Sequence, residues 1–172
     1  MSAAGSDDLE AFPPLNWAAQ DPSNCSIGLT IDLVGDKWAL LILRELVFGV
    51  DRFDAVQSHL GISRRTLAER LDALVSHSLV VREPVAVAGQ RPRHRYVLTQ
   101  AGLELIPVIV ALREWGDRHR PDASAPPVAL LHAECGGAVG IAFRCEHGHD
   151  ITPPQGIRLA RGPGAVDLVA EG

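Results

Sequence analysis

The stretch that decides the fold runs from Asp51 to Tyr96 and reads DRFDAVQSHLGISRRTLAERLDALVSHSLVVREPVAVAGQRPRHRY. Its first part predicts a short helix, since Phe53, Val56 and Leu60 are apolar at three- and four-residue steps. A turn follows, and Ser63 is typical of an N-cap because its hydroxyl can accept a hydrogen bond from a free backbone N–H of the next helix. We therefore expect two short helices joined by a tight turn.

The helix after Ser63 has an apolar side and a polar side. The apolar residues recur at positions i, i+4, i+7 and i+8 and are expected to face a core: Leu67, Leu71, Leu74 and Val75. The first turn carries both Arg64 and Arg65, and the N-terminal residues of a recognition helix reach base edges in the major groove of DNA. The alternative is an ordinary solvated surface helix, which has the same pattern.

A β-hairpin is predicted directly after this helix. Leu79–Arg82 and His94–Leu98 are short β-prone runs, and Gly89–Pro92 between them is a turn signal. Helix, turn, helix and hairpin in this order is the winged-helix arrangement. The hairpin carries arginines at alternate positions, which lie on one face if the strand is regular: Arg91, Arg93 and Arg95.

Further helices are predicted on both sides of this stretch. Residues 26–34 and 37–48 have helical apolar spacing, and Asp36 can cap the second of these helices. A long helix is expected from Gln100 to about Arg118, where Pro107 should bend or break it. This helix is too apolar for one small domain to cover, which favours a dimer interface; the alternative is packing within its own domain.

The fold class predicted is α+β, with a mainly helical winged helix-turn-helix domain, a β-hairpin wing and a small β-rich C-terminal appendage. Residues 1–24 are expected to form a flexible arm, and residues 25–120 the DNA-binding and dimerisation domain. Residues 121–127 have the composition of a linker, and residues 128–172 are expected to form the β-rich appendage. The appendage contains four β-like runs: residues 128–132, 140–144, 157–160 and 165–170.

The charge distribution agrees with a local DNA-binding face. The 172-residue chain has a net charge of −5, but residues 61–98 hold seven arginines against three carboxylates. An acidic body with one basic block can still bind phosphates at that block. No stretch has the length of a membrane span, the N-terminus does not resemble a signal peptide, and the three cysteines are widely spaced. A cytoplasmic protein is therefore expected.

The segment from Cys25 to Trp115 resembles the HxlR-type transcriptional regulators, which are winged-helix proteins related to the MarR group. The matching pieces follow one another in the family's order: Cys25, Gly35–Trp38, Ile42–Leu46, Arg52–Phe53, Gly61–Ser63, Leu67, Arg70–Leu71, Leu79–Val80, Arg82, Pro92, Tyr96–Thr99, Gly102, Leu112 and Trp115–Gly116. The resemblance implies a dimeric bacterial repressor or activator with one recognition helix and one wing per subunit. The wing departs from the family pattern over Val85–Gln90.

The predicted function is that of a DNA-binding transcriptional regulator, which acts as a homodimer on a pseudo-palindromic operator. Arg64, Arg65 and Thr66 are expected to probe the major groove, and Glu69 to accept a hydrogen bond from a cytosine amine. Arg70 could contact a base, a phosphate or the core. The wing arginines Arg91, Arg93 and Arg95 are expected to contact phosphates or the minor groove.

Two alternatives use the same scaffold. One is a protein-interaction module that no longer binds DNA. The other is a sensor with a small-molecule effector between the long apolar helix and the DNA-binding core. An enzyme is not expected, because the sequence has no Gly-rich phosphate loop, Gly-x-Ser-x-Gly or His-Glu-x-x-His motif, and no paired carboxylates in an apolar setting.

The resemblance also implies a role for Cys25, since several family members use an N-terminal cysteine to sense oxidants or electrophiles. A helix N-terminus stabilises a thiolate. Neither Cys135 nor Cys145 is close to it in the sequence, so a disulfide partner would come from the other subunit. The alternative is a buried, inert cysteine.

Potential metal ligands gather in the C-terminal region. His132-x2-Cys135 and Cys145-x3-His149 form two pairs that suit tetrahedral Zn²⁺, because thiolate and imidazole are ligands that zinc prefers. A similar tail in some relatives has a second cysteine where this chain has Gly148. A metal-free β-rich appendage is therefore the alternative.

Overall fold

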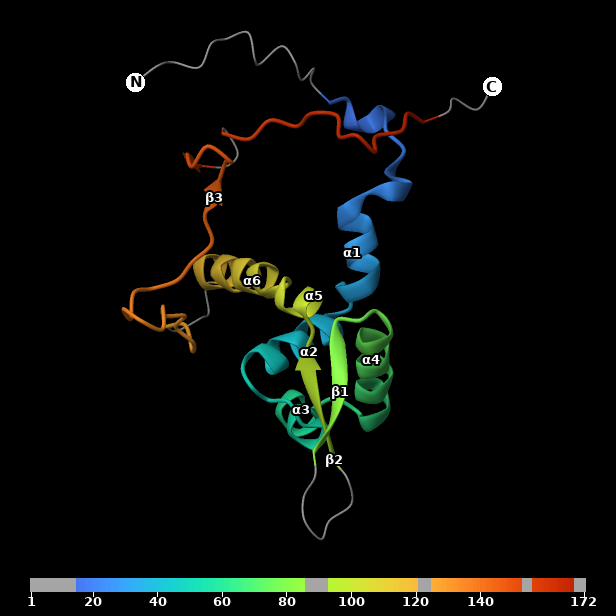
Figure 1. The fold of residues 1–172 in the computed structure, drawn as a ribbon, viewed down its shortest axis with the longest axis vertical. Helices are drawn as coiled ribbons and strands as arrows, with labels where there is room; N and C mark the ends of the chain where they lie inside the picture. The colour runs from blue at the N-terminus through green and yellow to red at the C-terminus, as the bar shows by residue number, and fades with distance from the viewer. Residues whose placement is uncertain (1–14, 86–92, 121–124, 153–155, 169–172) are drawn as a thin grey trace. The chain divides into compact units, whose positions relative to one another are not determined.

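The structure is a computed structural model that describes residues 15–85, 93–120, 125–152 and 156–168 (Figure 1). The chain divides into two compact units, Thr30–Ile141 and a second unit formed by Met1–Leu29 and Ala142–Gly172. Helix α1 (Ser26–Val34) crosses the boundary between them. In the part of the chain that is described, no helix combines the length and the apolar character needed to cross a membrane.

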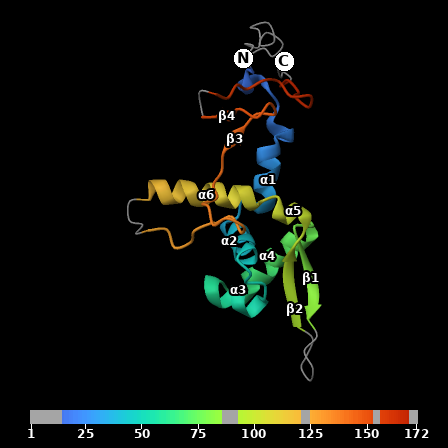
Figure 2. The same ribbon diagram turned by 60° about the vertical axis from the view of Figure 1, so that its left-hand side comes forward.

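The first unit contains the winged helix that the sequence predicts. Helices and strands follow in the expected order: α2 (Lys37–Val47), α3 (Phe53–Leu60), α4 (Arg64–Ser76), β1 (Val80–Val85), β2 (Arg93–Leu98), α5 (Gln100–Leu103) and α6 (Ile106–His119). Figure 2 shows the β1–β2 hairpin from the side, extending away from the helices. The mainly helical α+β fold with a β-hairpin wing is confirmed.

Helix α2 lies at the centre of this unit. The carboxylate of Asp36 accepts a hydrogen bond of 2.9 Å from the backbone N–H of Trp38 and so caps the helix. Ile42 and Leu43 are completely buried, and α2 packs against α4, where Leu67 and Leu71 are also completely buried. The apolar side predicted for the recognition helix therefore faces the core.

The wing is joined to the helical core at its base. Strands β1 and β2 pair in antiparallel register from Val80 opposite Leu98 to Val85 opposite Arg93. The backbone N–H of Tyr96 donates a hydrogen bond of 2.8 Å to the carbonyl of Asp51, just before α3. Tyr96 is itself buried, so the hairpin has a fixed origin beside α3.

The predicted long helix from Gln100 to Arg118 is broken into α5 and α6. Pro107 stands in the first turn of α6, where its missing N–H needs no partner, and this confirms the predicted break. Gly102 allows α5 to lie close to Leu79, just before β1, since a Cβ at this position would come within 2.2 Å of the Leu79 carbonyl oxygen. Only glycine fits there.

The C-terminal region contains less strand than its sequence suggests. Among its described residues, the strands are β3 (Phe143–Arg144) and β4 (Asp150–Ile151), so of the four β-like runs only residues 140–144 include a strand. Leu131 and Asp167 form isolated bridges, and residues 157–159 form no strand. Frequent glycine and proline keep these runs short.

The two compact units have other residue ranges than the predicted domains, and the domain boundaries themselves stay a prediction. Residues 125–141 belong with the winged helix, because the backbone N–H of Ile141 donates a hydrogen bond of 3.0 Å to Glu114 on α6.

Residues 15–24, expected in a flexible arm, form the 3-10 turns Trp17–Ala19 and Pro22–Asn24. They pair with the C-terminal segment, where the N–H of Leu168 donates to the Ala19 carbonyl at 2.9 Å. The rest of the predicted arm, residues 1–14, lies outside the described residues.

A buried carboxylate connects α2 to α3. The side chain of Glu45 is 1% exposed and forms ion pairs with Arg44 on the same helix and with His59 on α3. Burial raises the pKa of Glu45, but the hydrogen bonds from His59 and Arg44 and their charges lower it by more, so the pKa lies below its ordinary value. The charged form of Glu45 therefore stabilises the folded chain.

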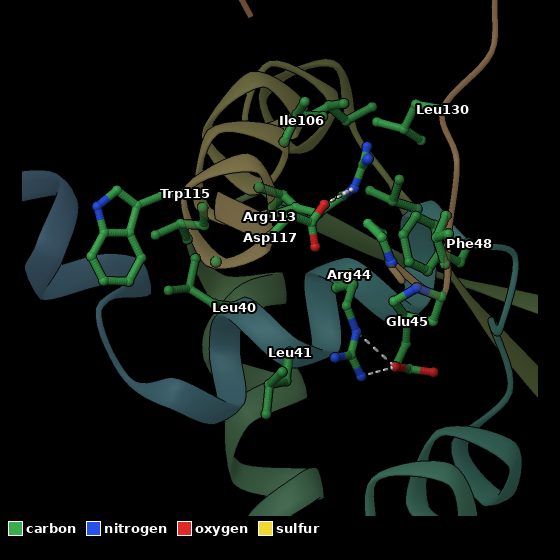
Figure 3. Close-up of a pocket in the computed structure, with 18 of the residues that line it drawn as sticks. Leu40, Leu41, Arg44, Glu45, Phe48, Ile106, Arg113, Trp115, Asp117 and Leu130 are labelled. Carbon is green, nitrogen blue, oxygen red and sulfur yellow. Dashed lines mark hydrogen bonds and ion pairs between the residues drawn. The ribbon is translucent and has the colours of Figure 1, made fainter. Parts of the chain in front are cut away.

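We predict that Glu45→Gln lowers the free energy of unfolding at pH 7 by about 1–3 kcal/mol. Glutamine removes the buried negative charge and leaves Arg44 and His59, which are partly exposed, with weaker hydrogen bonds (Figure 3 shows the pair of Arg44 and Glu45). A lowered pKa in the folded state gives stability that is present above the pKa of an unfolded glutamate, about 4.3, and is lost as the pH falls through the folded pKa. The difference between wild type and variant should therefore shrink as the pH falls below about 4.

Urea unfolding at several pH values measures this difference. The matched control is Glu104→Gln, since Glu104 is exposed and accepts a hydrogen bond from Gln100 on its own helical segment. Its effect should stay within about 0.5 kcal/mol. A Glu45→Gln effect that is the same at every pH would contradict the assigned role of the carboxylate.

Candidate nucleic-acid interface

The start of α4 is fixed by the turn before it. Gly61 ends α3 with φ of 62°, a left-handed conformation that favours glycine. The Ser63 hydroxyl accepts a hydrogen bond of 3.1 Å from the backbone N–H of Thr66 and lies 2.8 Å from the Thr66 hydroxyl. Ser63 is thus the predicted N-cap, and Thr66, half-buried, takes part in the cap.

Arg64 and Arg65 extend from the first turn of α4 into solvent. Their side chains are 73% and 89% exposed. Arg64 pairs with Asp54 at 3.3 Å and lies over the ring of Phe53, while the Nε of Arg65 donates to Glu69 at 2.8 Å. Exposed ion pairs contribute little free energy, so either guanidinium can exchange its carboxylate for an acceptor on DNA.

Glu69 and Arg70 lie one turn further along α4. Glu69 holds the guanidinium of Arg65 and is itself about half exposed. Arg70 contacts Asp36 at 3.1 Å, the residue that caps α2. This ion pair links α4 to α2, and a contact of Arg70 with a base or a phosphate stays a prediction.

The wing presents two of its three predicted arginines within the described residues. Arg93 and Arg95 are both exposed on β2, and Arg91 lies outside the described residues. Arg95 pairs with Glu83 on β1 at 2.7 Å. Within the described parts of the chain, Arg93 has no ion pair, so its charge is available to a phosphate.

One connection between α4 and the wing was missed by the sequence reasoning. Arg82 on β1 pairs with Asp72 on α4 at 2.7 Å, and its guanidinium lies over the ring of Tyr96. The positions of Arg82 and Asp72 in the sequence predict that both side chains are exposed. Their pairing depends on how β1 packs on α4, which no local pattern shows.

Cys25 lies directly before α1. Its carbonyl accepts the hydrogen bond of 2.9 Å from the Leu29 N–H that begins the helix, and its thiol is half-buried and free. The expected position at a helix N-terminus is therefore observed.

The four predicted zinc ligands form two local pairs. The Nδ1 of His132 lies 3.2 Å from the Cys135 sulfur, and the Cys145 sulfur lies 3.4 Å from the Nδ1 of His149. Each pair lies at a tight turn with a glycine at positive φ: Gly136 follows Cys135, and Gly148 lies between Cys145 and His149. Among the described residues, no three metal-binding side chains are grouped together. Gly148 thus serves the turn between Cys145 and His149.

Comparison with known proteins gives a consistent result. A model of the HxlR-like helix-turn-helix family matches residues 33–124. An HTH-type transcriptional regulator of Mycobacterium tuberculosis is 42% identical over 140 residues, which cover 81% of this chain and 87% of the relative.

Solved structures resemble the chain as well. The crystal structure of PA1607, a candidate transcription factor, has a TM-score of 0.69 and 32% identity, covering 81% of this chain and 96% of that one. The redox regulator HypR in its oxidized form has a TM-score of 0.51 and 28% identity, covering 56% of this chain and 98% of that one.

Proposed function

This chain belongs to the HxlR-like helix-turn-helix family of transcriptional regulators, and we propose from that premise that it binds a pseudo-palindromic DNA operator as a homodimer. The observation that carries the proposal is the first turn of α4, which exposes Arg64 and Arg65 on a capped helix of an acidic chain. Thr66 and Glu69 lie beside them, and Arg93 and Arg95 add positive charge on the wing. We propose a cytoplasmic location, and a non-enzymatic role is supported by the names of the relatives.

The homodimer is supported by apolar side chains that are exposed in the described part of the chain. Ile31 and Leu33 on α1 are 58% and 41% exposed, and Leu112 and Trp115 on α6 are 53% and 60% exposed. Exposed apolar surface of this kind marks a protein interface. A dimer places two recognition helices about one helical turn apart on DNA, which matches a palindromic operator.

We also propose that the regulator responds to a signal. HypR is a redox regulator, and Cys25 stands at a helix N-terminus with a partly accessible thiol. A peroxide or similar oxidant would convert the Cys25 thiolate to a sulfenic acid, and a thiol of the partner subunit would then condense with it to form a disulfide and release water. A small-molecule effector is the other route.

The recognition helix gives the first prediction about DNA. Arg65→Ala should cost about 1–3 kcal/mol of specific binding and relax the preference at one base position per half-site, because a guanidinium forms paired hydrogen bonds with guanine. A binding-site selection assay measures both effects. The matched control is Arg118→Ala, which removes an exposed, ion-paired arginine from α6. Unchanged affinity and specificity for Arg65→Ala would refute its role.

The wing gives a separate prediction, because exposed strand arginines reach phosphates more readily than base edges. Arg93→Gln with Arg95→Gln should weaken binding to all duplexes alike and reduce the salt slope by about one unit per lost phosphate contact. Arg144→Gln is the control, since Arg144 is an exposed, ion-paired arginine outside the wing. A changed sequence preference with an unchanged slope would contradict this role. Absent or salt-insensitive duplex binding by the wild type would favour the protein-interaction module.

Coordination of one Zn²⁺ by His132, Cys135, Cys145 and His149 stays a prediction, supported by the donor chemistry and the short distances within each pair. Protein expressed without added zinc should contain about one zinc per chain by elemental analysis, because a small segment with little core draws stability from a metal. Cys145→Ser should lower the zinc content while the winged helix stays folded, and Cys25→Ser should leave it unchanged. Well below one zinc per chain in the wild type would exclude the site.

A further inference from the structure

A loop in the C-terminal region binds the residues that precede α1. Residues 161–168 form this loop, called here the C-terminal loop, and Figure 1 shows it in red beside the blue 3-10 turns. The backbone N–H of Asp21 donates a hydrogen bond of 2.7 Å to the Val166 carbonyl, and the side-chain amide of Asn24 donates to the Gly164 carbonyl. The C-terminal loop therefore holds the chain directly before α1.

An arginine closes the C-terminal loop on itself. The guanidinium of Arg161 donates to both carboxylate oxygens of Asp167, at 2.6 and 3.2 Å, and to the Ala165 carbonyl at 3.3 Å. Asp167 also accepts a hydrogen bond of 2.8 Å from the buried side-chain amide of Gln20. The hydrogen bonds from Arg161 and Gln20 lower the pKa of Asp167, so its carboxylate is charged at neutral pH. Asp167 thus both closes the loop and attaches it to the segment before α1.

Cys25 is tied to the segment that the C-terminal loop holds. Its backbone N–H donates a hydrogen bond of 3.0 Å to the Pro22 carbonyl, and its carbonyl accepts one of 2.9 Å from the Leu29 N–H in the first turn of α1. The thiol is half-buried and free. A thiol reacts according to its exposure, so local opening of the segment before α1 would change the reactivity of Cys25.

We propose that the C-terminal loop controls access to the Cys25 thiol. While the loop is attached through Asp167, the start of α1 is fixed and the thiol stays half-buried. When the loop detaches, the first turn of α1 frays and the thiol becomes accessible to electrophiles and oxidants. The side chains of Arg161 and Asp167 are 44% and 63% exposed, so their ion pair opens more readily than the core of the winged helix. The use of this control in an oxidant response rests on the proposed function, whereas access itself does not.

Alkylation of the full chain by iodoacetamide, followed by mass spectrometry, measures access to each cysteine separately. Asp167→Ala removes the acceptor for Arg161 and Gln20, so we expect Cys25 to react at least about threefold faster than in the wild type. Cys135 in the same samples is the internal reference, because it is exposed and lies outside the C-terminal loop. Its rate should stay unchanged.

Asp150→Ala is the matched control. Asp150 lies on β4 and forms an exposed ion pair with Arg144 at 2.9 Å, comparable to that between Asp167 and Arg161. Its loss should leave the Cys25 rate at the wild-type value. Arg161→Ala should also raise the Cys25 rate, and the double variant with Asp167→Ala should be no faster than Asp167→Ala alone, because both changes open one loop. Circular dichroism checks that each variant is folded.

Three results would overturn the proposal: an unchanged Cys25 rate in Asp167→Ala, an equal rise in Asp150→Ala, or an equal rise at Cys135. Hydrogen peroxide with dimedone, which traps a sulfenic acid, separates the proposal from the oxidant response. The thiolate sulfur bonds to one peroxide oxygen, the O–O bond breaks, and the released hydroxide is protonated to water. If alkylation depends on Asp167 but no sulfenic acid forms at Cys25, the loop controls access and the proposed oxidant response is wrong.

Discussion

The packing of α2 against α4 is the contact on which the rest of the structure depends. Ile42, Leu43, Leu67 and Leu71 are completely buried, so the face that α4 presents to solvent is fixed by the face that it presents to α2. Close-packed side chains of this kind leave little freedom for a helix to turn about its axis. The Arg70–Asp36 ion pair adds a polar contact at the edge of the same interface. The outward direction of the first turn of α4 follows from this packing.

Arginines of the basic surface already form ion pairs, which contribute little free energy because they are exposed. Arg64, Arg65 and Arg95 each pair with an exposed carboxylate, which orients the guanidinium without binding it strongly. Such pairs limit non-specific attraction to DNA, as the net charge of −5 also does. Affinity for a specific site would then depend on replacing each carboxylate with a better-placed acceptor on the duplex.

Local patterns in the sequence were enough to predict the elements of the winged helix. They predicted too much strand after residue 128 and did not show the contacts between distant segments. The spacing of Leu67, Leu71 and Leu74 predicted the buried side of α4, the hydroxyl of Ser63 predicted its cap, and Pro107 predicted the break before α6. The pairing of residues 15–24 with residues 159–168 rests on backbone hydrogen bonds, which leave no pattern, and on side-chain bonds such as that from Gln20 to Asp167, which are far apart in the sequence. Likewise, Glu114 could not be assigned to Ile141, nor Asp72 to Arg82, before the elements were placed in space.

The central claim is that the exposed first turn of α4 reads a specific DNA sequence in the dimer. Footprinting of the purified protein on the DNA upstream of its own gene tests this claim most directly. The account predicts two protected half-sites related by a dyad and about one helical turn, or a multiple of it, apart, with guanine N7 atoms protected in the major groove. Uniform protection along the duplex, or none at low salt, would contradict it.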